Sequence, residues 1–153
     1  MLSKERLKGI TLFKELSDEE IEVVASILDE AFYEKGSMIW EENAAARGLH
    51  VIDHGKVRIS RMTREGHRQV LGVLRENRFF GELSLLDGRM HSASAEAVED
   101  TKVYLLNGEK MDKLVKENPL IAYNILREMT IQLCELLRQM NMKFMDMVNY
   151  VWE

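Results

Sequence analysis

The chain has 153 residues, of which 46% are hydrophobic and 31% are charged, and its formal net charge is -5. A chain of this length buries a sizeable core without disulfides or structural metals, so we predict one domain over residues 1–153. The acidic balance argues against a nucleic-acid surface, because neutralising phosphates requires a clustered excess of Lys and Arg. The first residues lack a signal-peptide core, and no uncharged run approaches the ~20 residues of a membrane span. We therefore predict a cytoplasmic protein that contacts neither DNA nor membranes directly.

Residues 3–30 follow a helical pattern in two pieces. Ser17 is placed to cap the second piece, and Glu20 three residues later completes a capping box. Apolar side chains then recur at a helical spacing and form a stripe that we expect to be buried: Ile21, Val24, Ala25 and Leu28. The sequence thus predicts helices before the first strand.

Over residues 31–107 the hydrophobic period falls towards two. Short apolar runs are separated by turn signals at residues 35–36, 53–55, 64–66 and 87–88. Within two of the runs, alternate residues share one face that we expect to be buried: Val57, Ile59 and Arg61 in the first, and Val70, Gly72 and Leu74 in the second. The spacing predicts about eight short strands, and an antiparallel β-roll is the natural way to close them.

Beyond Asn107 the period returns to that of a helix. A short helix is predicted to end before Pro119, because proline breaks helices, and a long helix is predicted over residues 120–150. Apolar residues on the long helix follow the spacing of a coiled-coil seam: Leu126, Leu133, Leu137, Met140, Phe144, Met147 and Val151. A second stripe, Ile125, Met129 and Leu136, is expected to face the roll. One domain does not easily cover both stripes, so we predict a homodimer through this helix; a single wide stripe on the chain's own core is the alternative.

Cys134, the only cysteine, lies on the same predicted helix. A lone cysteine excludes an intrachain disulfide and suits a reducing compartment. We expect its side chain to be buried among apolar neighbours, as most free cysteines are.

Residues 79–97 carry the features most closely tied to chemistry. Gly81 permits close approach of the backbone, and a short helix that begins near Leu83 directs unpaired N–H groups at an anion. Glu82, beside these donors, can accept a hydrogen bond from a ligand hydroxyl. The alternative is that Glu82 is a plain helix-start charge favoured by the helix dipole. The segment predicts a site for an anionic small molecule.

This segment resembles the phosphate-binding cassette of the cyclic-nucleotide-binding family, which includes catabolite-activator and FNR-type bacterial regulators, kinase regulatory subunits and gated channels. In the family, Phe-Gly-Glu precedes a short helical turn and then Pro-Arg-Ser/Ala-Ala; here Phe80, Gly81 and Glu82 match the first part. The likeness extends over residues 8–148 and includes Leu12-Phe13, residues 16–20, Leu49 and residues 55–59. It implies an α+β, mainly β fold: an antiparallel β-roll or jelly roll (double-stranded β-helix), flanked by N-terminal helices and a long C-terminal dimerisation helix. It also implies cyclic AMP or another cyclic nucleotide as the ligand, with Glu82 at the ribose 2'-hydroxyl, and no cofactor.

The sequence departs from the family at the residue that pairs with the phosphate. Alignment places Met90 at the family's Pro and His91 at its Arg, whose guanidinium fork matches two phosphate oxygens. Three hypotheses follow. A partly protonated His91 keeps a weak, pH-dependent affinity for an anion, or Arg89 supplies the charge, or cyclic-nucleotide binding has been lost.

The candidate ligand-binding residues lie in the cassette and on the long helix, where related regulators place a polar residue against the base. They are Phe80, Gly81, Glu82, Leu83, Ser84, Arg89, His91, Ser92, Ala93, Leu136 and Leu137. Both of the helix residues are apolar, which favours the loss of nucleotide binding.

An enzyme of the cupin type is the alternative from a different class, because small β-barrels of that type bind metal through clustered His side chains. His50 and His54 lie four residues apart in one predicted strand, and about 3.3 Å per residue separates them by about 13 Å, too far to share a metal ion. No catalytic motif accompanies them. We predict neither a metal site nor an enzymatic activity.

DNA-binding relatives continue from the long helix into a helix-turn-helix, whereas this chain ends at Glu153, so the resemblance is to the sensor half alone. We predict a ligand-sensing domain that signals through its dimeric helix to an unknown downstream protein. A degenerate homologue that acts only as a dimeric scaffold is the competing hypothesis.

Overall fold

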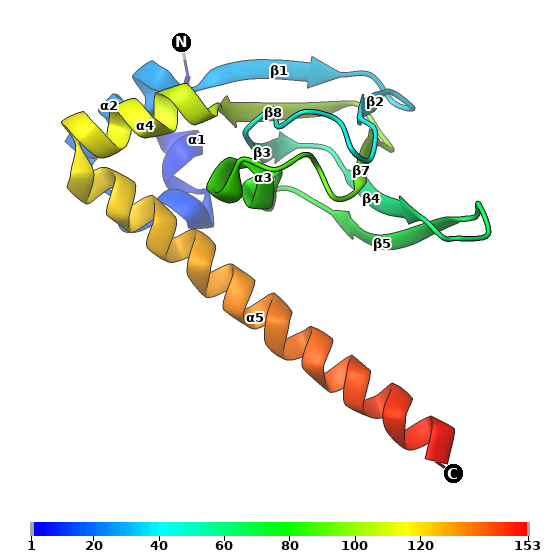
Figure 1. Cartoon of the computed structure of the whole chain (residues 1–153). Helices are drawn as coiled ribbons and strands as arrows, with labels where there is room; N and C mark the ends of the chain where they lie inside the picture. Colours follow the sequence, from blue (N-terminus) through cyan, green and yellow to red (C-terminus); the bar gives the residue numbers. More distant parts are fainter. Residues whose placement is uncertain (1, 153) are drawn as a thin grey trace.

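A computed structural model describes residues 2–152 (Figure 1). The helices are α1 (Lys4–Lys8), the 3-10 turn η1 (Thr11–Phe13), α2 (Asp18–Ile27), α3 (Glu82–Asp87), α4 (Gly108–Glu117) and α5 (Pro119–Trp152). The strands are β1 (Asp29–Tyr33), β2 (Met38–Trp40), β3 (Leu49–His54), β4 (Val57–Met62), β5 (Arg68–Leu74), β6 (Phe79–Phe80), β7 (Ser94–Ala97) and β8 (Thr101–Leu106). This order confirms the predicted succession of helices, strands and helices.

The start of α2 is fixed by the predicted capping box. Ser17 Oγ accepts a hydrogen bond from the Glu20 N–H at 3.2 Å, and the Glu20 carboxylate accepts one from the Ser17 N–H at 2.9 Å. Ile21 and Val24 of the predicted stripe are fully buried. The first helical piece is divided at Gly9, which ends α1 before η1 begins.

The strands form two four-stranded antiparallel sheets. One sheet has the order β1-β8-β3-β6 and the other has the order β2-β7-β4-β5. Side chains from both sheets meet in one buried cluster: Ile39, Trp40, Ile52, Val57, Phe80, Ala95, Ala97 and Val103. The two sheets therefore enclose a core between them, which confirms the predicted jelly roll.

The β4–β5 hairpin departs from strict alternation. Val57 is buried and Ile59 is half-buried, as predicted, but the pairing register shifts between Ile59 and Ser60. A bulge of this kind turns the following residues over. Ser60 is therefore buried, and Arg61 is exposed instead of continuing the buried face. On β5, Gly72 and Leu74 are half-buried, whereas Val70 is 45% exposed, so the prediction of a buried face is wrong at Val70.

A second buried cluster lies where helices cover the β1-β8-β3-β6 sheet. The sheet contributes Leu49, Val51, Tyr104 and Leu106. The helices contribute large apolar side chains from α1, η1, α2, α4 and α5: Leu7, Phe13, Ile21, Leu114, Ile125 and Met129, among others. This cluster fixes the beginning of α5 against the roll.

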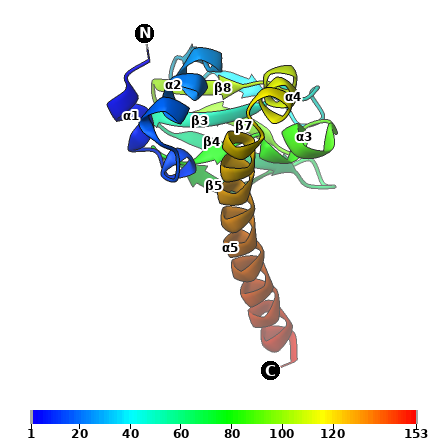
Figure 2. The ribbon, with the colours of Figure 1, turned by 90° about the vertical axis from the view of Figure 1, so that its left-hand side faces the viewer.

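After its first half, α5 leaves the body of the molecule and extends away from both sheets (Figure 1, Figure 2). Its buried residues all lie between Ile121 and Met129. Ile125 and Met129 of the predicted roll-facing stripe are among them. Cys134 lies beyond this covered stretch and is exposed, so the prediction of a buried cysteine is wrong.

No helix among residues 2–152 is both long enough and apolar enough to cross a membrane. Within the same residues, no three or more His, Cys, Asp or Glu side chains are grouped to hold a metal ion. His50 and His54 both lie on β3, as predicted, with His50 buried and His54 exposed.

Candidate ligand-binding site

A cavity of about 410 Å³ lies between the roll, α3 and α5. Pockets of about 300–1,000 Å³ are typical of small-molecule sites. The roll and the loop that contains His91 contribute Trp40, Ile59, Leu71, Gly72, Leu74, Arg78, Phe79, Phe80, Gly81, His91, Ser92 and Ala93; α3 contributes Glu82, Leu83 and Ser84; α5 contributes Gln132, Leu133, Leu136, Met140 and Lys143. Nine of the eleven predicted ligand-binding residues are thus brought together around one space, the exceptions being Arg89 and Leu137.

Gly81 makes the sharp turn from β6 into α3 possible. Its φ of 81° lies in the left-handed region that favours glycine. A side chain at this position would also overlap the carbonyl oxygen of Gly48. The close backbone approach that the sequence predicts at Gly81 is therefore present, and it places Glu82 directly at the cavity wall.

His91, at the family's arginine position, is held on three sides. The Arg47 N–H donates to His91 Nε2 at 3.1 Å, so in the neutral ring Nδ1 carries the proton and donates to Ser84 Oγ at 3.1 Å. The ring also stacks on Trp40, with centroids 3.7 Å apart and planes at 8°. His91 is only 3% exposed.

Burial lowers the pKa of His91 below its usual value, and the nearby Arg47 guanidinium lowers that pKa further. Protonation at Nε2 would also break the bond from the Arg47 N–H. The ring is therefore neutral near pH 7 and serves to orient Ser84. Because Ser84 Oγ accepts from His91, its own proton stays available for a ligand.

A second imidazole lies behind the first. His50 Nδ1 donates to the Gly48 carbonyl at 3.1 Å, and its ring contacts Trp40 and Phe80 at centroid distances of 4.9 and 5.1 Å. Burial lowers the pKa of His50 to about 4. The wall behind the cassette is thus aromatic and uncharged.

Glu82 is the one acidic residue among the cavity-lining side chains. Burial raises the pKa of its carboxyl group, although a bond from its own backbone N–H works in the opposite direction. A carboxyl group with a raised pKa carries a proton for a larger fraction of the time. Glu82 can therefore donate a hydrogen bond to a ligand as well as accept one.

Arg89 lies outside the cavity lining. Its side chain is 85% exposed, and its guanidinium approaches Asp87 at 3.9 Å. Its backbone N–H donates to the Asp87 carboxylate at 2.9 Å. The geometry thus keeps Arg89 on the α3 side of the turn, away from the space that His91 and Ser84 border.

On α5, the residues that face the cavity begin one turn earlier than the sequence predicts. Leu136 lines the cavity, but Leu137 is exposed on another face. The turn before them presents Gln132, whose Nε2 is buried without a hydrogen-bond partner among residues 2–152. A polar residue therefore does face the cavity from the long helix. Gln132 is the residue one helical turn after Met129, on the same face as the buried Ile125 and Met129.

Two basic residues also line the cavity, and the sequence interpretation missed both. Lys143 comes from α5, and Arg78 comes from the loop between β5 and β6. This loop is pinned to β3, because the Ile52 N–H donates to the Arg78 carbonyl and the Asn77 N–H donates to the Ile52 carbonyl, both at 2.9 Å.

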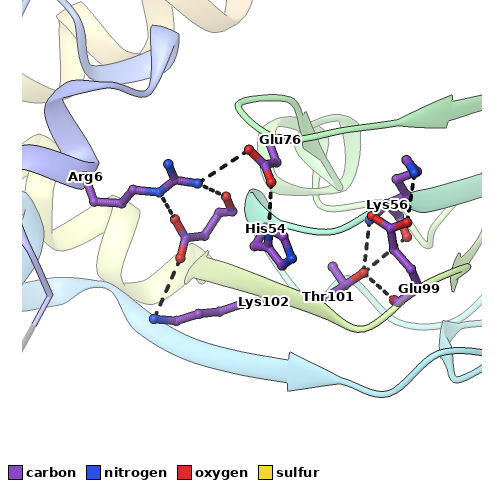
Figure 3. Close-up of polar contacts among 8 residues, drawn as sticks. Arg6, His54, Lys56, Glu76, Glu99, Thr101 and Lys102 are labelled. Carbon is purple, nitrogen blue, oxygen red and sulfur yellow. Dashed lines mark hydrogen bonds and ion pairs between the residues drawn. The ribbon is translucent and has the colours of Figure 1, made fainter.

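Ion pairs fix the same loop from outside (Figure 3). The Glu76 carboxylate forms a hydrogen bond with His54 Nδ1 at 2.7 Å and an ion pair with Arg6 of α1 at 3.7 Å. Arg6 also pairs with Asp53, and Lys102 of β8 approaches Asp53 at 3.7 Å. The loop that carries Arg78 is thus tied to both α1 and β3.

Comparison with known proteins places these features in a family. The model of the cyclic nucleotide-binding domain matches residues 30–118. The cyclic AMP receptor protein of Thermus thermophilus is 36% identical over 119 residues, which cover 78% of this chain and 55% of that protein.

Solved structures give the same result. The catabolite activator protein of Thermus thermophilus matches with a TM-score of 0.75 and 32% identity, over 86% of this chain and 62% of that chain. A cyclic nucleotide-binding domain from Methylobacillus flagellatus matches in fold with a TM-score of 0.83 and 21% identity, over 89% of this chain and 79% of that chain.

The chain spans about half the length of the bacterial curated relatives it matches, such as 55% of the Thermus thermophilus receptor protein. The family match covers β1 to α4, including the cassette and every strand. The chain belongs to the cyclic nucleotide-binding domain family, and it resembles the sensor domain of catabolite-activator and FNR-type regulators.

Proposed function

We propose that this chain is a cytoplasmic ligand-sensing module, organised as one domain, that binds a cyclic nucleotide or a related anionic small molecule in the cavity and signals through paired α5 helices. The observation that carries the proposal is that the cassette and α5 share one cavity. A ligand that contacts Ser84 of α3 and the buried Gln132 amide of α5 touches the cassette and the long helix at once. Its occupancy then biases how α5 lies, and a downstream protein partner responds to that change.

Binding is tested by titrating the chain with cyclic AMP and cyclic GMP in a calorimeter. Wild type lacks a fixed cation at position 91, so we expect weak binding. His91→Arg should bind cyclic AMP roughly ten- to a hundredfold more tightly, because a charge-assisted contact to phosphate contributes about 1.5–3 kcal/mol. His67→Arg is the matched control, since His67 is exposed and lies outside the cavity lining.

His91→Arg also removes the acceptor for the Arg47 N–H and the stacking partner of Trp40. Thermal unfolding of the variant should therefore be recorded alongside the titration. Gln132→Leu gives a second measurement without this complication, and it should weaken whatever binding wild type shows. Unchanged affinity in both variants would contradict the proposed site.

Self-association is proposed from the distal seam, the five apolar residues Leu137, Met140, Phe144, Met147 and Val151, all of which are exposed. Leu126 and Leu133 of the predicted seam are half-buried within the chain itself. Parallel pairing of two α5 helices would cover the distal seam.

Leu137→Glu with Phe144→Glu should convert the dimer to a monomer in sedimentation experiments. Met142→Glu is the matched control, because Met142 lies on the opposite face of the same helical turns. A wild-type monomer at tens of micromolar would show that the seam is not a dimer interface.

A dimeric scaffold without a ligand is the second candidate, and the neutral, fully engaged His91 ring favours it. The two candidates separate in ligand-dependent melting. A ligand that binds the native state raises the melting temperature with concentration. A flat response to every ligand tried, with the dimer intact, would support the scaffold.

A further inference from the structure

Resting on the proposed sensing role, we propose that the ligand is an elongated, mostly apolar molecule with one anionic head, and that Arg78 and Lys143 bind this head. Lys143 lies at the end of the cavity farthest along α5 from Gln132, Arg78 lines the same cavity, and neither occupies the cassette position where the family has its arginine. The bound anion would then bridge the roll and the distal half of α5.

The charges around the cavity support an anionic ligand. The chain as a whole has a formal net charge of -5, yet the cavity is lined by two basic side chains and one carboxyl group. Neither Arg78 nor Lys143 forms an ion pair or a side-chain hydrogen bond with another residue of 2–152. Both cations are therefore available to an anion from solution.

The inner end offers neutral groups. Ser84 presents a hydroxyl proton that His91 leaves free, and Gln132 presents a buried amide without a partner. Burial also favours the protonated form of Glu82 by raising its pKa. This end suits a hydrogen-bond acceptor such as a hydroxyl or carbonyl oxygen, and it supplies no positive charge to a phosphate.

The length of the site follows from α5. Gln132, Leu136, Met140 and Lys143 all line the cavity, and a helix rises about 1.5 Å per residue, so roughly 16 Å separates the first from the last. Between these ends the walls are apolar: Ile59, Leu71, Leu74, Leu133, Leu136 and Met140. An extended apolar body with a head at Lys143 matches this order of groups.

Fluorescence of Trp40 provides a direct reporter, because Trp40 lines the cavity and the chain has only two tryptophans. Trp152→Phe leaves Trp40 as the single tryptophan. The probes are decanoate, decyl phosphate and the neutral decanol, each kept below micelle formation. Decanoate against decyl phosphate distinguishes a carboxylate head from a phosphate head.

We expect both anions to change Trp40 fluorescence and to bind about tenfold more tightly than decanol. Arg78→Gln and Lys143→Gln should each weaken binding of the anions about fivefold and leave decanol unchanged. Added salt should weaken the binding of the two anions and leave the binding of decanol unchanged. Arg75→Gln and Arg138→Gln are matched controls on the same loop and helix, outside the cavity lining, and they should have no effect.

Equal binding of decanoate and decanol, or anion binding unchanged in the Arg78→Gln, Lys143→Gln double variant, would overturn the assignment of the head. If cyclic AMP binds and neither decyl anion does, the sensing role stands and this ligand class is wrong. If cyclic AMP, cyclic GMP and both anions leave Trp40 unchanged, the proposed function itself fails and this inference fails with it.

Discussion

Met129 and Met147 lie on the same helix, yet Met129 is fully buried and Met147 is 67% exposed. The sequence around both residues has an apolar stripe at helical spacing. The difference is that the rest of the chain buries α5 only as far as Met129, through the cluster that contains Ile125 and Met129. An amphipathic pattern therefore shows which face of a helix is apolar, but the rest of the chain decides whether that face is covered. Within the described residues, the distal half keeps its apolar face exposed.

The largest expected effect separates the two methionines. Met129→Ala should lower the free energy of unfolding by about 2–5 kcal/mol, because it leaves a cavity in a packed cluster. Met147→Ala should change it by less than about 0.5 kcal/mol. Urea unfolding of both variants in the Leu137→Glu, Phe144→Glu background measures this without a contribution from dimerisation. Equal losses would show that the distal half packs against the chain's own body, as the single wide stripe requires.

The stability of the roll should depend on pH near neutrality, and the behaviour of the distal half of α5 should not, because all four histidines lie outside α5. The pKa of His50 falls from 6.5 to about 4 on burial. The unfolded chain therefore binds more protons than the native chain between these values, and stability is lost as the pH falls below 6.5. The contribution of His50 amounts to about 2 kcal/mol between about pH 7.5 and about pH 5. Association through the distal seam should not follow this dependence.

His50→Asn is the variant that isolates this effect, since its amide nitrogen can replace Nδ1 as the donor to the Gly48 carbonyl. The variant should be less stable than wild type at neutral pH and should lose less stability on acidification. The lowered pKa of His91 contributes in the same direction. An identical pH dependence of unfolding in wild type and His50→Asn would show that His50 is not the buried neutral group described above.

Local patterns predicted the elements well, because their causes are local. The capping box at Ser17 and Glu20 fixes the start of α2, and the helical period fixes α5 to within two residues of the predicted bounds. The bulge after Ile59 was missed, since a register shift depends on the partner strand. The burial predicted for Cys134 follows from the usual burial of free cysteines. It is wrong because Cys134 lies beyond Met129, the last buried residue of α5.

The site was predicted only in part, for a related reason. The cassette is one continuous segment, so its residues could be named together. The stack of His91 on Trp40 and the meeting of Arg78 with Lys143 around one cavity join segments that are far apart in the sequence. Gln132 could have been predicted from the sequence, because it lies one helical turn after Met129 on the stripe that includes Ile125 and Met129. The likeness to related regulators pointed instead to Leu136 and Leu137, one turn farther along α5.

The smallest predicted effect again contrasts the two halves of α5, this time through their acidic residues. Glu128 is buried, and its carboxylate pairs with Lys14 at 3.2 Å and with Arg127 at 3.8 Å. Glu128→Gln keeps the volume and an acceptor oxygen but removes the charge. Because Lys14 and Arg127 are each about half exposed, water solvates them after the loss, and the cost should be only about 1 kcal/mol.

Asp146→Asn is the matched change in the distal half, where the carboxylate is exposed and has no ion pair within residues 2–152. It should change the free energy of unfolding by less than about 0.5 kcal/mol. Added salt tests the contrast, since a pair with one buried partner is screened less than two fully exposed charges. The difference between the two variants in urea unfolding should therefore persist when the salt concentration is raised. Its disappearance in high salt would mean that the Lys14 pair behaves as a surface interaction, and that the first half of α5 is held by its apolar contacts alone.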